Sequence, residues 1–269
     1  MSHLSASLLG AIAGATIFIG LPIGRVRGLP RRVQGFLNAL ATGVLIFLLW
    51  DILSHASTPV ENYFTGMLHP GYGTPFGLSK VSSFVTMATA FAGGLTVGLL
   101  GLIYFNARVF HRAPGATPAP RTLALMIATG LGMHNLSEGL AIGQSAATGA
   151  VAFAGVLVMG FALHNITEGF GIAAPLSLEP TAPSWGFLGA AGLIGGGPTF
   201  AGTVIGYMAT STYIYVLFLA LAAGALIYVI NEMFHVGRRV TSPAGLGWGI
   251  LLGFLVAYAT DLFLIYLNI

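Results

Sequence analysis

The chain has 269 residues, of which 56% are hydrophobic and only 6% are charged, and its formal net charge is +3 at pH 7. Soluble domains carry about 25% charged residues, so this composition excludes an ordinary soluble domain and predicts a polytopic membrane protein. The absence of cysteine excludes disulfides and thiolate metal sites.

Eight stretches are long and apolar enough to cross a bilayer, which takes roughly 20 predominantly apolar residues. They cover residues 8–24, 36–55, 84–105, 123–147, 151–175, 185–208, 213–235 and 246–267. We therefore predict an all-α fold, a bundle of eight transmembrane helices that forms one domain over residues 1–269. The first span is not expected to be a cleaved signal peptide, because arginines follow it and no basic residue precedes it.

The basic residues predict the direction of the spans. All nine arginines follow the first, third or seventh span: Arg25, Arg27, Arg31, Arg32, Arg108, Arg112, Arg121, Arg238 and Arg239. Only Lys80 falls on the other side. Basic residues accumulate on the cytoplasmic side of a membrane. We therefore expect the protein to lie in a plasma or inner membrane with both termini on the side away from the cytoplasm. This sorting forms no patch for nucleic acid.

The connections and the helix-breaking residues give further expectations. Short links around "TGA" and "ATST" predict two antiparallel hairpins, one between spans four and five and one between spans six and seven. The links after spans two and three are longer and are expected to be loops. "GGGP" in the sixth span predicts a broken or kinked helix that opens backbone carbonyls to a cavity, and Pro175 predicts a kink in the fifth.

The fourth and fifth spans contain two nearly identical motifs, "HNLSEG" from residue 134 and "HNITEG" from residue 164. A charged residue at the centre of a membrane helix costs about 2.5–3.5 kcal/mol unless it is paired, protonated or liganded. In an α-helix, residues i and i+4 share a face, so each histidine projects beside the glutamate of its own motif. Each asparagine flanks that face and can offer an amide oxygen.

If the two helices form a hairpin, six donor side chains converge at one depth. They are His134, Asn135, Glu138, His164, Asn165 and Glu168. This set suits Zn²⁺, and also Fe²⁺, Mn²⁺ or Cd²⁺, as a transported ion rather than as a prosthetic group. One His-x-x-x-Glu pair is equally well explained as a hydrogen-bonded contact between helices, whereas two copies favour a role in binding metal or protons.

Two further clusters lie near span ends. Asp51 and His55 are again four residues apart, and form either a candidate entrance for cations or an interfacial salt bridge. Asn231, Glu232 and His235 form a candidate exit, although side chains at a span end can also reach water directly. Asp261 is isolated, and His3, His69 and His111 lie in the termini or loops.

The paired "HNLSEG" and "HNITEG", together with "WDILSH" at the end of the second span, resemble the ZIP (Zrt/Irt-like) family of metal-ion transporters. The resemblance covers essentially the whole chain. It implies that the six motif residues bind metal midway across the membrane, that Asp51 and His55 serve the entrance, and that a homodimer carries divalent metal into the cytoplasm. Ser137 and Thr167 stand where many relatives have proline, and "GGPT" lacks the glutamate that adds to a second metal position in many relatives.

Two other function classes stay open. A proton-coupled transporter or channel for another substrate would use Glu138 and Glu168 as proton carriers. An intramembrane metalloenzyme is the third class; it is not expected, because the His-Glu-x-x-His motif of zinc proteases is absent and no separate nucleophile is found.

Overall fold

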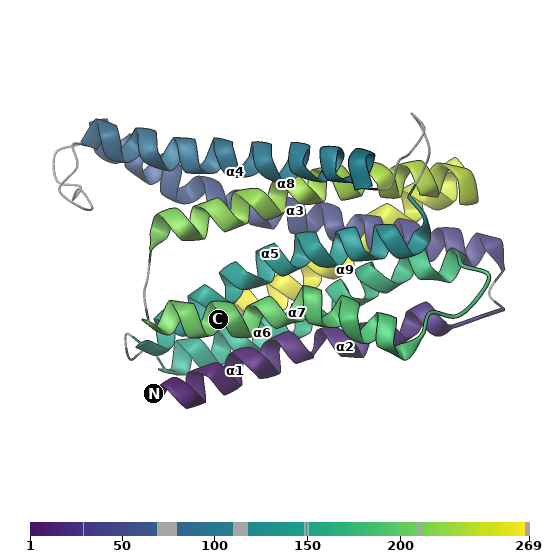
Figure 1. Cartoon of the computed structure of the whole chain (residues 1–269), viewed down its shortest axis with the longest axis horizontal. Coiled ribbons are helices and arrows are strands. Elements are labelled where there is room, and N and C mark those ends of the chain that lie inside the picture. The colour runs from purple at the N-terminus through teal and green to yellow at the C-terminus, as the bar shows by residue number, and fades with distance from the viewer. Residues whose placement is uncertain are drawn as a thin grey trace.

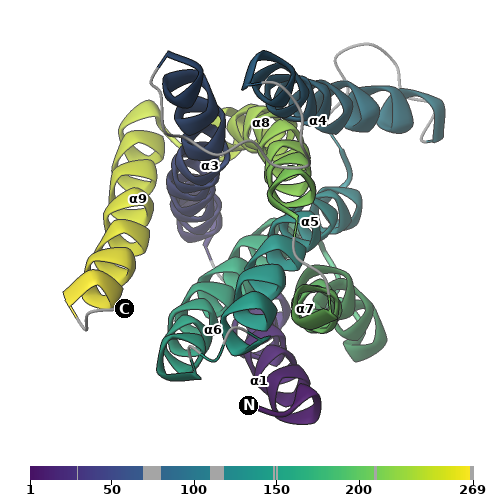
Figure 2. The same cartoon turned by 90° about the vertical axis from the view of Figure 1, so that its left-hand side faces the viewer.

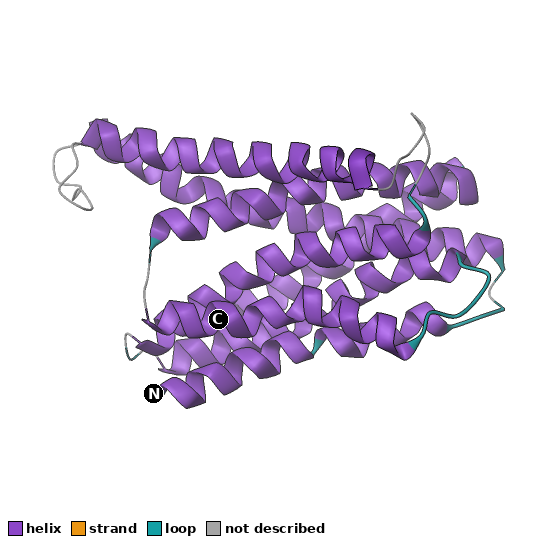
Figure 3. Cartoon of the chain, viewed as in Figure 1, coloured by secondary structure: helices purple, strands orange, loops and turns teal. Residues whose placement is uncertain are grey.

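The structure is a computed structural model that describes residues 1–28, 30–68, 80–109, 118–147, 149, 151–208 and 211–266. Within the helices, the side chains of His164 and several other residues lie outside the description. The regular structure of the described residues is entirely helical, as the all-α prediction requires (Figure 3). The loop histidines His69 and His111 fall outside the described residues.

The helices follow one another along the chain in the order of the colours in Figure 1. They are α1 (His3–Ala15), α2 (Ile17–Gly20), η1 (Leu21–Arg25), α3 (Arg31–Leu68), α4 (Lys80–Val109), α5 (Pro120–Ala147), α6 (Val151–Ala173), η3 (Ala174–Leu178), α7 (Trp185–Met208), α8 (Thr212–Val240) and α9 (Pro243–Tyr266). η1 and η3 are short 3-10 helices.

Seven helical segments of the described chain are long and apolar enough to cross a membrane, which supports a multi-pass membrane protein. The sequence predicts eight such spans. The segment that does not reach the hydropathy of a span is α5, although it has 28 residues. It contains the first motif, and His134, Asn135 and Glu138 lower its mean hydropathy.

Several boundaries differ from those expected. α3 continues as helix to Leu68, with Pro59 inside it, where a loop is expected after residue 55. α7 runs without a break through Pro198, so a broken helix at "GGGP" is wrong and the kinked helix stays a prediction. The interruption occurs in the first span instead, where Thr16 separates α1 from α2. Pro175 lies in η3, directly after the end of α6.

The helices pack in two groups (Figure 2). The α5 group contains α1, α2, α5, α6 and α7, and the α3 group contains α3, α4, α8 and α9. The expected hairpin of the sixth and seventh spans is wrong, because the described part of α7 packs on α5 and α1, whereas α8 packs on α4 and α3. The hairpin of α5 and α6 is confirmed. The two groups meet mainly where α5 packs on α8.

Glycines bring the backbones of the α5 group into direct contact. A Cβ atom at Gly202 of α7 would overlap the carbonyl oxygen of Leu136, and one at Gly139 of α5 would overlap that of Thr199. Gly196 of α7 meets Gly14 of α1 in the same way. Such close packing by small residues is a main source of helix association in membranes, where the hydrophobic effect no longer drives it.

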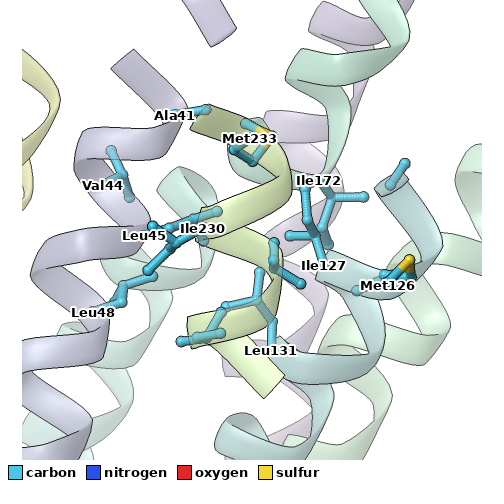
Figure 4. Packing of buried hydrophobic residues seen from close by; sticks show 14 of the residues in the cluster. Ala41, Val44, Leu45, Leu48, Met126, Ile127, Leu131, Ile172, Ile230 and Met233 are labelled. Carbon is cyan, nitrogen blue, oxygen red and sulfur yellow. The ribbon is translucent and has the colours of Figure 1, made fainter. Parts of the chain in front are cut away.

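Apolar side chains form much of the contact between the two groups. A single apolar cluster joins α3, α5, α6 and α8, and Figure 4 shows how its aliphatic side chains meet. Leu45 and Leu48 come from α3, Ile127 and Leu131 from α5, and Ile230 from α8. The groups are therefore separate packing units joined by an aliphatic interface.

A glycine substitution tests the α5–α7 contact. Gly202→Ala is expected to destabilise the protein by about 1–3 kcal/mol, because the added methyl group forces two packed backbones apart. Gly197→Ala in the same helix is the matched control, because a Cβ there would meet no atom within 4 Å. Thermal unfolding in detergent should show a lower midpoint for Gly202→Ala alone. Equal midpoints for the two variants would contradict the packing described here.

Candidate functional site

The described motif side chains lie in the interior of the protein. His134, Asn135 and Glu138 of α5 and Asn165 and Glu168 of α6 are all buried. The α5–α6 hairpin places the two motifs on neighbouring helices, as the sequence predicts. His164 lies one turn before Glu168 on α6, and its side chain is outside the described residues.

Asn135 connects the two motifs directly. Its Nδ2 donates a hydrogen bond of 2.7 Å to Oε2 of Glu168 and one of 3.0 Å to the carbonyl oxygen of Gly195 in α7. Both acceptors are oxygens, so the amide nitrogen must face them. The amide oxygen of Asn135 then points away from these two partners.

Asn165 is oriented in a similar way by the interruption of the first span. Its Nδ2 donates to the carbonyl oxygen of Ala13 at 2.9 Å. That carbonyl lies at the end of α1, where Thr16 turns its own hydroxyl back to the same oxygen at 2.6 Å. The carbonyl is available because the α-helical hydrogen-bond ladder stops there.

This orientation leaves a set of buried acceptor oxygens. Among the described residues, Oδ1 of Asn135, Oδ1 of Asn165 and Oε2 of Glu138 receive no hydrogen bond. A buried acceptor without a partner costs about 1–3 kcal/mol. The site therefore favours an occupant that offers positive charge or hydrogen-bond donors to these oxygens.

His134 and Glu138 form the expected i, i+4 pair on α5. Nε2 of His134 lies 3.2 Å from Oε1 of Glu138, and both side chains are almost completely buried. In the part of the chain that the structure describes, no three His, Asp or Glu side chains lie close enough to hold one metal ion. Further donors for a metal here are the asparagine oxygens, the His164 imidazole and a Glu168 carboxylate turned away from Asn135.

A cavity of about 60 Å³ connects this pair with the candidate entrance. Asp51 and His55 of α3 line it together with His134 and Glu138. A cavity needs only about 10–15 Å³ to hold one water, so this one has room for an ion with part of its hydration shell. The two sites that the sequence treats as separate thus share one space.

The Asp51–His55 pair lies at the exposed side of that cavity. Nδ1 of His55 lies 3.3 Å from Oδ1 of Asp51 and 3.0 Å from its carbonyl oxygen. The imidazole is 60% exposed, whereas the carboxylate is only 20% exposed. The pair therefore reaches from the surface toward the interior.

The candidate exit on α8 is placed differently. Asn231 and His235 are exposed on one face of α8, and Glu232 is partly buried. The cavity shared by Asp51 and Glu138 does not include these three residues. Their role as an exit stays a prediction. Asp261 is partly buried in α9.

The structure adds residues that sequence reasoning missed. Tyr215 of α8 and Phe161 of α6 line the shared cavity, and so does Ser137, whose buried hydroxyl has no hydrogen-bond partner among the described residues. The backbone carbonyls of Ala13 and Gly195 orient the two asparagines. Only the serine carries a sequence signal, since it lies inside the first motif, directly before Glu138.

Comparison of the chain with models of known protein families and with curated proteins gives no match. The geometry of the site therefore carries the functional argument.

Asn165 should contribute to stability through α1. Asn165→Ala removes its hydrogen bond to Ala13 and opens a buried gap, so we expect a loss of about 1–3 kcal/mol. Asn231→Ala, the same substitution at an exposed position, is the control and should change the free energy of unfolding by less than about 0.5 kcal/mol. Chemical or thermal unfolding of both variants measures the difference. An unchanged Asn165→Ala protein would mean that this contact does not hold α6 to α1.

Proposed function

We propose that the protein transports a divalent metal ion across the membrane through the shared cavity and the paired motifs. Zn²⁺ is the expected substrate, with Fe²⁺, Mn²⁺ and Cd²⁺ as competitors. The observation that supports this most is the set of buried oxygens on Asn135, Asn165 and Glu138 that receive no hydrogen bond. Imidazole, carboxylate and amide oxygens together are donors that these ions accept.

In this proposal, the ion moves from Asp51 and His55 along the cavity to His134 and Glu138. There the ion replaces the direct contact between these two side chains and binds both of them. Glu168, the two asparagine oxygens and His164 of α6 complete the six donors. Release follows at the other end, by way of Glu232 and His235. This donor set and the "WDILSH" segment also carry the resemblance to ZIP transporters.

α5 serves as the eighth span in this arrangement. Its 28 residues correspond to about 42 Å at 1.5 Å per residue, which exceeds the roughly 30 Å of a hydrocarbon core. The motif residues of α5 are buried against other helices, so their polarity is not presented to lipid. With eight spans, both termini lie outside and the arginine-rich helix ends lie in the cytoplasm.

The two helix groups offer a means of alternating access. Glycine contacts tie α1, α5 and α7 together backbone to backbone and tie α2 to α6 in the same way, so the motifs belong to a stiff unit. The interface with α3 and α8 is formed by aliphatic side chains, which have no directional bonds to break when one surface shifts along the other. We therefore expect the α5 group to slide or rock against the α3 group.

Uptake into liposomes tests the proposal. Wild-type protein should take up Zn²⁺ saturably, and the double variant His134→Ala, Glu168→Gln should lower uptake at least about tenfold, because even residues that only orient metal ligands contribute about 10- to 100-fold. Glu61→Gln, which removes an exposed glutamate of α3, is the control and should retain uptake. Competition by Fe²⁺, Mn²⁺ and Cd²⁺ ranks the ions.

The same assay separates the proton alternative. If His134→Ala retains activity, and wild-type protein changes the internal pH without moving metal, then Glu138 and Glu168 carry protons and the metal proposal is wrong.

The entrance pair is tested by concentration dependence. Asp51→Asn should raise the Zn²⁺ concentration for half-maximal uptake about tenfold at low salt, because focused negative charge increases the local concentration of a cation. The difference should shrink at high salt, because salt screens the long-range attraction between the entrance and a cation in solution. Ser54→Ala, a neutral change at an exposed neighbouring position, is the control. A defect that is the same at low and high salt would contradict an electrostatic entrance.

A further inference from the structure

A second, larger pocket lies outside the motif region, within the α3 group. It has a volume of about 550 Å³ and is formed where α3 begins, α8 ends and α9 begins. Its lining residues are Arg32, Phe36, Arg239, Val240, Thr241, Ser242 and Gly245. None of the functional residues considered above contributes to it.

The lining is suited to an anion. Two arginines line it from different helices, and no acidic residue is among the described lining residues. Ser242 accepts a hydrogen bond from the amide of Gly245 at 3.1 Å, so the pocket wall includes the first turn of α9. Backbone N–H groups at a helix start add a partial positive charge. Arginine binds phosphate in bidentate geometry, which fits this arrangement.

The pocket is held open by close backbone packing. A Cβ atom at Gly35 would crowd Thr241 and the carbonyl oxygen of Val240, so α3 and the α8–α9 turn are fixed against each other. Asn38, one turn further along α3, donates a hydrogen bond to the carbonyl oxygen of Met233 in α8. The two arginines are therefore carried by elements whose relative position is set without a ligand.

The location points to a lipid rather than to a dissolved ion. The pocket lies at the end of the bundle where η1, α5 and α8 also carry arginines, and both Arg32 and Arg239 are exposed there. Trp248 on α9 is 62% exposed, as is common for tryptophan at the level of lipid headgroups. Phe36 and Val240 add apolar walls beside the charged groups.

We propose that this pocket binds the phosphate headgroup of an anionic phospholipid. Arg32 and Arg239 pair with the phosphate, Thr241 and Ser242 lie beside the headgroup, and the acyl chains run along the exposed surface of α9. The bound lipid bridges α3, α8 and α9, and so stabilises the α3 group. Basic pockets between membrane helices on the cytoplasmic side are a known form of headgroup site. The proposal does not depend on the transport function.

Native mass spectrometry of the full-length protein in detergent tests it, because no bilayer surface is present to attract lipid nonspecifically. Phosphatidylglycerol and phosphatidylcholine are titrated separately, with and without excess inorganic phosphate. The test variants are Arg32→Gln, Arg239→Gln and their combination. The control is Arg31→Gln with Arg238→Gln, which removes the same charge from adjacent positions that do not line the pocket.

The expected result is selective binding of phosphatidylglycerol that weakens at least about tenfold in the double pocket variant and about threefold or less in the control. Each single pocket variant should bind phosphatidylglycerol with an affinity between those of the wild type and the double variant. A graded loss of this kind indicates loss of binding contacts rather than misfolding. Three outcomes would overturn the proposal: equal weakening in the control pair, equal binding of both lipids, or displacement of the lipid by inorganic phosphate at comparable concentration. The last would identify a site for a dissolved anion.

Discussion

The hydrogen bond from Asn135 to Glu168 is the contact on which the arrangement of the site depends. It joins the two motif helices at the point where each carries a buried carboxylate. The same amide also donates to Gly195, so α7 is drawn into the network. Because a buried polar group must find partners, this single side chain fixes α5, α6 and α7 relative to one another. It also leaves the asparagine oxygen on the opposite side, which is where a cation would be received.

Glycine provides the second constraint. The α5 group can approach backbone to backbone only because Gly139, Gly196 and Gly202 carry no Cβ, and this closeness brings the carbonyl of Gly195 within reach of Asn135. The contact with the α3 group uses leucine and isoleucine side chains instead. One interface thus fixes the register of its helices, whereas the other has no directional bonds. The proposed movement of the α5 group as a unit would require this difference.

The polar residues of the chain divide between these two groups. The motifs lie in the α5 group, whereas the entrance pair and the basic pocket lie in the α3 group. The shared cavity forms between the groups, where Asp51 of α3 and Glu138 of α5 both line it. A lipid bridging Arg32 and Arg239 would leave this cavity untouched, and it would stiffen the group against which the motifs move in the proposed transport cycle.

Composition and helical period by themselves determine the helical class, the membrane character and the likeness of the two motifs, because these depend only on which residues recur and at what spacing. They also place His134 beside Glu138, since four residues in a helix make one turn. Hydropathy alone does not identify α5 as a span, because the polar residues of the first motif lower its mean hydropathy. The tertiary structure alone decides that α7 packs on α5 and not on α8, that the first span breaks at Thr16, and that Ala13 and Gly195 orient the asparagines. These features depend on contacts between residues up to about 150 positions apart in the chain. The local spacing of residues does not predict such contacts.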